Sequence, residues 1–109
     1  MIDTARCIAV DWGTTSLRAT LLGSGGQALD HVARPKGILA VTDGDFAGEF
    51  NAACGVWRQA HPAIAVLMSG MIGAQQGWLE APYLEAPCDL EGLIAAMVTV
   101  PGTDGAVRI

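Results

Sequence analysis

The segment from Cys7 to Ala19 constrains the fold more than any other part of this chain. An unbroken apolar run, Ile8 to Val10, is followed by a polar bend and then by apolar residues at every second position from 17 to 21. Unbroken apolar runs are typical of buried strands, and alternation is typical of strands with one buried face. The segment therefore predicts a β-hairpin whose first strand lies in the interior.

The bend of this hairpin gathers polar groups that suit phosphate and metal binding. Asp11 projects a carboxylate from the end of the first strand, and Gly13 lets a ligand approach the backbone closely. The hydroxyl-bearing residues that follow are Thr14, Thr15 and Ser16. Hydroxyl and N–H donors in a turn favour anions, and Mg²⁺ is usually held through a carboxylate, phosphates and water. The bend therefore indicates a site for a nucleotide's phosphates and their metal ion, with a plain polar turn as the alternative.

Three further elements are predicted before residue 70. Residues 28–34 form a third strand that a proline ends, which gives an antiparallel meander. Apolar residues recur at helical spacing from Phe46 to Ala60, and Asp43 or Asp45 can cap this helix. The unbroken apolar run from Ile64 to Met68 predicts a parallel strand that is covered on both faces.

The last part of the chain predicts a second helix and a final strand. The helix begins near Asp89, carries Met97 and Val98 on its apolar stripe, and ends at Pro101. Residues 106–109 then begin a strand with no stopping signal, so we expect the chain to end inside a larger domain with an unpaired sheet edge. The order β-β-β-α-β-α-β predicts an α/β architecture with a mixed sheet.

Composition narrows the classes of function. The chain has 109 residues, 51% of them hydrophobic, which fits one domain or part of one. A net charge of −5 with six Lys and Arg argues against a nucleic acid or an anionic membrane as partner. Three widely spaced cysteines favour reduced thiols, and residues 63–68, the longest apolar run, are too few to span a bilayer. We expect a cytoplasmic protein.

A glycine-rich loop follows the predicted parallel strand at its carboxyl end, where ligands bind in open α/β sheets. Its glycines permit close approach, and Gln75 and Gln76 offer donors and acceptors for hydroxyl groups. Trp78 can cover an apolar face of a substrate or pack in an aromatic corner. The candidate substrate residues are Ser69, Gly70, Met71, Gln75, Gln76 and Trp78. A structural loop that covers the sheet is the alternative.

These motifs resemble those of a known family. The string from Asp11 to Arg18 resembles the first phosphate-binding hairpin of the sugar-kinase and actin-like ATPase superfamily. Residues 35–39, 68–73 and 76–83 resemble the 2-dehydro-3-deoxygalactonokinases. The similarity covers essentially the whole chain but only the N-terminal part of that family's length.

The resemblance implies a ribonuclease-H-like mixed sheet over residues 1–109, the first domain of an actin-like sugar kinase whose second lobe is absent from this chain. It implies an ATP-dependent sugar-acid kinase that phosphorylates 2-dehydro-3-deoxy-D-galactonate at the 6-hydroxyl. Asp11 would then bind Mg²⁺, Gly13 to Ser16 and Arg18 would bind the ATP phosphates, and the loop would bind the sugar acid. The catalytic base is expected beyond Ile109, so this fragment alone is expected to be inactive.

Two other classes of function stay open. A ribonuclease-H-like, metal-dependent hydrolase would also use Asp11 as a ligand, although such sites need several clustered acids. A non-catalytic nucleotide-binding module would keep only the phosphate hairpin. The expected partners are ATP and a sugar acid, without nucleic acid or membrane, and a homodimer is left open.

Overall fold

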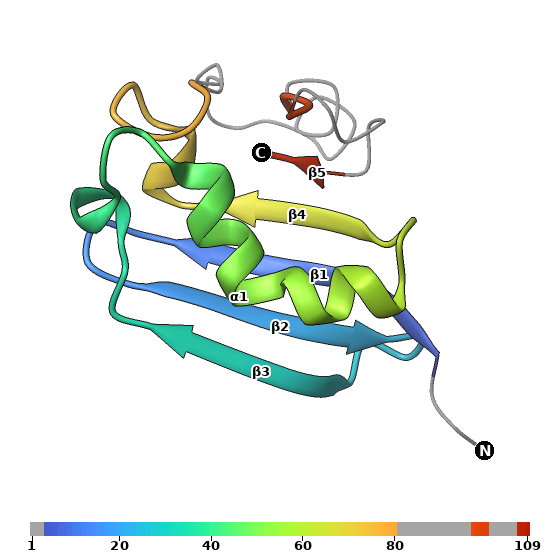
Figure 1. The fold of residues 1–109 in the computed structure, drawn as a ribbon. Helices are drawn as coiled ribbons and strands as arrows, with labels where there is room; N and C mark the ends of the chain where they lie inside the picture. Colours follow the sequence, from blue (N-terminus) through green and yellow to red (C-terminus); the bar gives the residue numbers. More distant parts are fainter. Residues whose placement is uncertain (1–3, 81–96, 101–106) are drawn as a thin grey trace.

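The computed structural model describes residues 4–80, 97–100 and 107–109, which form one mixed sheet with a helix across one face (Figure 1). The strand order is β3-β2-β1-β4-β5. The first three strands form an antiparallel meander, and β4 lies parallel to both β1 and β5. The strands are β1 (Ala5–Trp12), β2 (Leu17–Gly23), β3 (Ala28–Arg34), β4 (Ala65–Ser69) and β5 (Val107–Arg108). The predicted meander, parallel strand and terminal strand are therefore confirmed.

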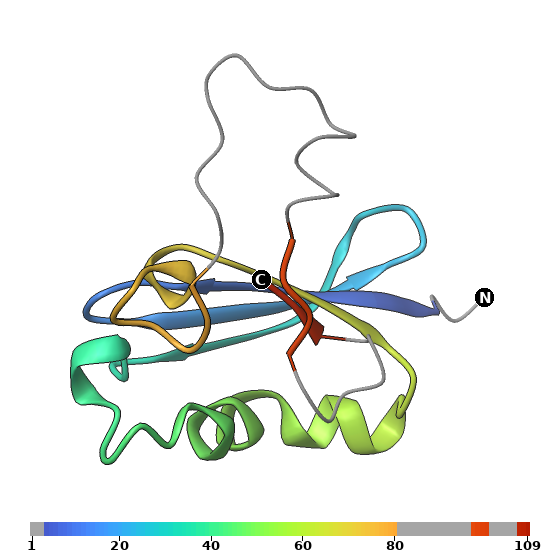
Figure 2. The same cartoon turned by 90° about the horizontal axis from the view of Figure 1, so that it is seen from above.

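Helix α1 (Phe46–Ala60) lies on one face of the sheet, as the view from above shows (Figure 2), and the buried residues of both form the core. Alternate residues of β1 point to this side, and Ile8, Val10 and Trp12 are all buried. They meet the buried alternate residues of β2, with Trp12 opposite Leu17. Full burial of one large apolar side chain contributes about 1.5–3 kcal/mol, so this alternation fixes which face receives the helix.

Helix α1 forms where the sequence predicts it. Its buried residues follow the helical period and are Phe50, Ala53, Cys54 and Trp57. Asp45, rather than Asp43, is the N-cap: its Oδ1 accepts a hydrogen bond from the Gly48 amide at 3.0 Å. Such a cap is worth about 1 kcal/mol. The helix therefore begins at the acid that best satisfies its free amides.

Strand β4 departs from the expected burial on both faces. Val66 and Met68 are buried beneath α1, whereas Leu67 on the other face is 44% exposed. The helix covers one side of the sheet, and no element within the described ranges covers β4 on the other. The unbroken apolar run predicted the strand correctly but not its open face.

Residues 97–100 are not helical, which corrects the expected end of the second helix. The amides of Val98 and Val100 donate to the carbonyls of Ile109 and Val107 at 2.9 and 3.0 Å. The segment of three β-branched residues from Val98 to Val100 favours extended backbone over helix. This pairing also covers the edge of β5 that we expected to be unpaired. The predicted start of the helix near Asp89 lies outside the described residues.

None of the helices described in the structure is both long enough and apolar enough to cross a membrane.

Candidate phosphate and substrate site

Asp11 lies on the open face of the sheet, opposite α1, at the carboxyl end of β1. It is exposed, between the buried Val10 and Trp12, because successive residues of a strand point to opposite faces. In register, Asp11 pairs with Arg18 of β2 and with Ser69 of β4. Paired residues on adjacent strands point to the same face and lie close together. The structure thus places the Asp11 carboxylate between the Arg18 guanidinium and the Ser69 hydroxyl in one row across the sheet.

The row is open to a ligand. Arg18 is exposed, and no hydrogen bond or ion pair from its side chain to Asp11 occurs within the described residues. The Ser69 hydroxyl donates to the carbonyl oxygen of Val10 at 3.4 Å, which ties it to β1. The carboxylate and the guanidinium are therefore both available for binding.

Residues 13–16, named here the phosphate turn after the binding that the sequence predicts for them, join β1 to β2 next to this row. The Gly13 amide donates to the Ser16 carbonyl at 2.9 Å, which closes the turn. Thr14 and Thr15 are exposed, and no hydrogen bond involving their hydroxyls is found in the described part of the chain. A methyl group at Gly13 would meet only the Ser16 carbonyl oxygen, at an ordinary 3.9 Å. The fold itself therefore does not require glycine at this position.

The loop after β4, residues 70–79, starts against Asp11. Gly70 has φ of 100°, and a side chain there would come within 2.8 Å of the Trp12 carbonyl oxygen and 3.3 Å of Asp11 Oδ1. Only glycine fits such a conformation and such an approach. The loop then forms the short 3₁₀ helix η2 (Met71–Gly73) and is closed by the Trp78 amide, which donates to the Ile72 carbonyl at 2.9 Å.

The predicted substrate residues divide into two groups. Ser69 and Gly70 border Asp11, as expected of a shared sheet edge. Met71, Gln75 and Gln76 are in a different situation: Met71 is 40% exposed, and the two glutamines are exposed without a side-chain hydrogen bond among those of the described residues. Contacts of these three side chains with a substrate stay a prediction.

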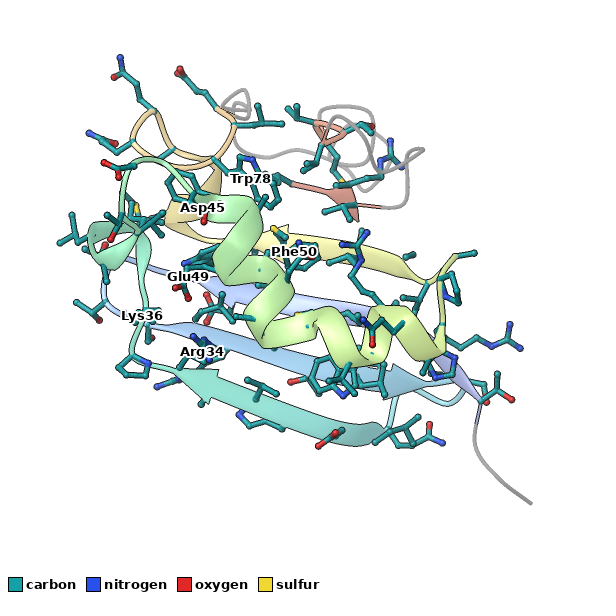
Figure 3. The ribbon with its side chains drawn as sticks, in the orientation of Figure 1. Arg34, Lys36, Asp45, Glu49, Phe50 and Trp78 are labelled. Atoms are coloured by element: carbon teal, nitrogen blue, oxygen red, sulfur yellow. The ribbon has the colours of Figure 1, made fainter. Side chains whose placement is uncertain are left out.

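Trp78 packs in an aromatic cluster of Trp12, Phe46, Phe50 and Trp78. Its ring stacks on Phe46 at a centroid distance of 6.4 Å and meets Phe50 at 5.8 Å. Figure 3 shows Trp78 beside the first turns of α1, on the same side as Phe50. The packing interpretation explains its position, and a contact with the substrate stays a prediction.

The segment after β3 is a part of this region that the motifs alone did not place. It contains the short 3₁₀ helix η1 (Ile38–Ala40) and lies against the phosphate turn. The Ile38 amide donates to the Gly13 carbonyl at 3.0 Å, and the Leu39 amide to the Thr14 carbonyl at 3.3 Å. The sequence signal was the resemblance of residues 35–39 to the family, which gives no indication of what this segment contacts.

Other polar groups serve the scaffold. Arg34 pairs with Glu49 of α1 at 3.3 Å on the helix side of the sheet (Figure 3). The indole N–H of Trp57 and then the His31 amide hold the pKa of Asp30 below its usual value. Burial raises the pKa of Cys54 to about 11, so this thiol stays protonated and unreactive.

Comparisons with known proteins identify the family of this chain. The family model of 2-keto-3-deoxy-galactonokinase matches residues 11–109. A Rhizobium meliloti protein named a probable 2-dehydro-3-deoxygalactonokinase is 33% identical over 93% of this chain and 33% of its own length. The Escherichia coli 2-dehydro-3-deoxygalactonokinase is 37% identical over 77% of this chain and 28% of its own length.

A solved structure shares the fold. It comes from Sinorhizobium meliloti, is described as a 2-dehydro-3-deoxygalactonokinase protein, and matches with a TM-score of 0.80 at 31% identity. The match covers 94% of this chain and 34% of that protein, so the chain spans about a third of the length of such relatives. The sheet and helix described above correspond to one part of that longer protein. This chain belongs to the 2-keto-3-deoxy-galactonokinase family.

Proposed function

We propose that residues 1–109 are the N-terminal domain of an ATP-dependent kinase that phosphorylates 2-dehydro-3-deoxy-D-galactonate at its 6-hydroxyl. The observation that carries the proposal is the row of Arg18, Asp11 and Ser69, which adjoins an open phosphate turn in a chain of this family. The rest of the enzyme would supply the adenosine pocket and the second wall of the cleft.

The nucleotide side of the site follows from charge and hydrogen-bonding capacity. Thr14, Thr15 and Ser16 would donate to phosphate oxygens, and Arg18 would neutralise part of their charge. Asp11 would hold Mg²⁺, directly or through water, and the ion when bound would offset the charge of the transferred phosphoryl group. The space at Gly13 supports close approach of a phosphate to the backbone.

The sugar side would be built by the loop after β4. Its start touches Asp11 through Gly70, so a hydroxyl group bound along this loop would lie near the phosphates held by the turn. The exposed amides of Gln75 and Gln76 can bind sugar hydroxyls. Asp45 is used as a helix cap and Glu49 is paired with Arg34, so neither is free to accept the 6-hydroxyl proton. As the family resemblance implies, we propose that this base lies beyond Ile109.

Two observations argue against the alternative of a ribonuclease-H-like, metal-dependent hydrolase. Such an enzyme needs several clustered acids, and in residues 4–80, 97–100 and 107–109 no group of three His, Cys, Asp or Glu side chains could hold a metal. The chain also carries a net charge of −5, unfavourable for nucleic acid. We further propose a cytoplasmic location, supported by the free thiols of Cys7 and Cys54.

The test uses a completed kinase, in which residues 1–109 replace the matching segment of the Rhizobium meliloti relative. We expect Mg²⁺-dependent formation of ADP that requires 2-dehydro-3-deoxy-D-galactonate, and product phosphorylated at the 6-hydroxyl by NMR. The epimeric sugar acid 2-dehydro-3-deoxy-D-gluconate serves as the control for stereochemistry. The 109-residue chain alone should show no turnover. A folded completed kinase that binds ATP without phosphorylating a sugar acid would leave the nucleotide-binding module as the better interpretation.

A further inference from the structure

We propose that Trp12 is a positioning residue that holds the phosphate turn (residues 13–16) and the loop after β4 (residues 70–79, here named the substrate loop) in one fixed arrangement. The inference rests on the proposed function, because it concerns how that site is assembled. Trp12 stands between Asp11 and Gly13 in the sequence, yet its ring lies on the opposite side of the sheet from the Asp11 carboxylate. Its contacts reach three segments that are far apart in the sequence.

The first contact is a hydrogen bond to the segment after β3. The Trp12 side chain is fully buried, and its Nε1 donates to the Lys36 carbonyl at 3.0 Å. From there the chain runs directly to the amides of Ile38 and Leu39, which donate to the carbonyls of Gly13 and Thr14. The indole thus fixes the segment that in turn fixes the phosphate turn.

The second and third contacts are aromatic. The ring centroids of Trp12 and Phe46, the first residue of α1, lie 5.8 Å apart, and the two ring planes meet at 67° in an edge-to-face arrangement. The ring of Trp78, at the end of the substrate loop, has its centroid 6.4 Å from that of Trp12, with an angle of 71° between the ring planes. Phe46 and Trp78 also stack on each other, so the three rings form a closed triangle. Edge-to-face pairs of this kind add directional stabilisation to the area they bury.

The substrate loop is therefore held at both ends by the same residue. At its beginning, Gly70 approaches the Trp12 carbonyl oxygen, and at its end Trp78 packs on the Trp12 ring. Between these points, the Trp78 amide binds the Ile72 carbonyl. Movement of Trp12 would displace the Asp11 carboxylate, the phosphate turn and the substrate loop together.

Such a displacement matters because phosphoryl transfer depends on alignment. The attacking hydroxyl and the transferred phosphoryl group must lie in line, and misplacement by about 1 Å can lower the rate about 100-fold. A residue that sets the distance between two substrate sites should therefore affect turnover more than the binding of either substrate alone.

Trp57 provides a matched control for simple core packing. It is also buried, at 7% exposure, and its Nε1 also donates a hydrogen bond of 3.0 Å, in this case to Asp30 Oδ2. Asp30 pairs with Leu21, toward the far end of β2 from the phosphate turn. Replacing either tryptophan by phenylalanine removes a similar volume and one indole hydrogen bond.

The experiment compares Trp12→Phe with Trp57→Phe in the completed kinase. For Trp12→Phe we expect kcat to fall about 10- to 100-fold, with smaller changes in the KM of ATP and of the sugar acid. Hydrogen exchange should rise about tenfold in residues 36–41 and 70–79. For Trp57→Phe we expect kcat within about twofold of the unaltered protein and no such rise in exchange.

A second variant, Phe46→Leu, keeps an apolar side chain but breaks the ring triangle without touching the Lys36 hydrogen bond. It should lower kcat in the same direction by a smaller factor. Equal kcat for the two tryptophan variants, or unchanged exchange in both segments for Trp12→Phe, would overturn the proposal. If the unaltered completed kinase has no activity, the proposed function fails, while the exchange data still decide whether Trp12 links the two segments.

Discussion

Gly37→Ala offers the sharpest test of how the phosphate turn is supported. Gly37 has an ordinary extended conformation, so alanine is conformationally acceptable there. A methyl group would nevertheless collide with the backbone of Thr14 and Thr15. Because backbone cannot rotate away as a side chain can, the segment after β3 must shift from the turn.

The cost follows from the contacts that the shift breaks. Hydrogen bonds from Ile38 to Gly13 and from Leu39 to Thr14 are weakened, each worth about 0.5–1.5 kcal/mol net. Overpacking adds about 1–3 kcal/mol. We therefore expect Gly37→Ala to lower the free energy of unfolding by about 3 kcal/mol, corresponding to a fall in Tm of about 10 °C or more.

Two other glycines serve as controls for this measurement. At Gly55, in the middle of α1, a methyl group meets no atom within 4 Å, so alanine should stabilise the chain by up to about 1 kcal/mol. At Gly13 alanine should leave stability nearly unchanged. Urea unfolding followed by circular dichroism gives all three values. The reasoning fails if Gly37→Ala unfolds at the same midpoint as the unaltered chain.

Four further predictions concern charges and amides. Asp11→Asn should abolish most turnover of the completed kinase without changing its Tm, and normal turnover at saturating Mg²⁺ would exclude Asp11 as the metal ligand. Arg18→Ala should raise the KM of ATP about tenfold; equal ATP affinity and rate would mean a merely solvent-facing arginine. Gln76→Ala should raise the KM of the sugar acid about tenfold, and an effect confined to ATP would contradict its placement. Trp57→Phe should raise the pKa of Asp30 toward 3.8, which NMR titration would measure. The variant should also lack the stabilisation that the unaltered chain loses as the pH falls through the lowered pKa of Asp30. An unchanged titration would show that the indole does not cause the lowered pKa.

The sequence predicted most of the fold because its regular elements are strongly periodic. The hairpin and α1 each bury one face, and the spacing of their apolar residues predicts that face directly. The third strand is largely exposed, and the proline that follows it marked its end. The spacing of apolar residues misled at residues 97–100, where a short apolar stretch fits a helix and a strand equally well. There, the β-branched residues at 98–100 decide for extended backbone.

The site was predicted only in part, for a related reason. Asp11 and Ser69 both follow apolar strands, so the sheet-edge rule brings them to the same side, although it does not say that they pair in register. The support of the turn by Ile38 and Leu39, and the hydrogen bond from Trp12 to Lys36, join residues more than twenty positions apart. The periodicity of apolar residues does not predict hydrogen bonds between such distant positions.

The glycines distinguish what the fold requires from what a ligand would require. The fold itself requires glycine at positions 37 and 70, because a side chain at either would collide with the backbone of the hairpin. Gly13 is not required: its neighbourhood leaves room for a methyl group, and Thr14 and Thr15 beside it are exposed. Under the proposed function, a glycine that the folded chain does not need, beside exposed hydroxyls and Arg18, would let a ligand group come close to the backbone. A phosphate of ATP is such a group, and Gly13→Ala should therefore weaken ATP binding in the completed kinase while leaving the unfolding midpoint in place.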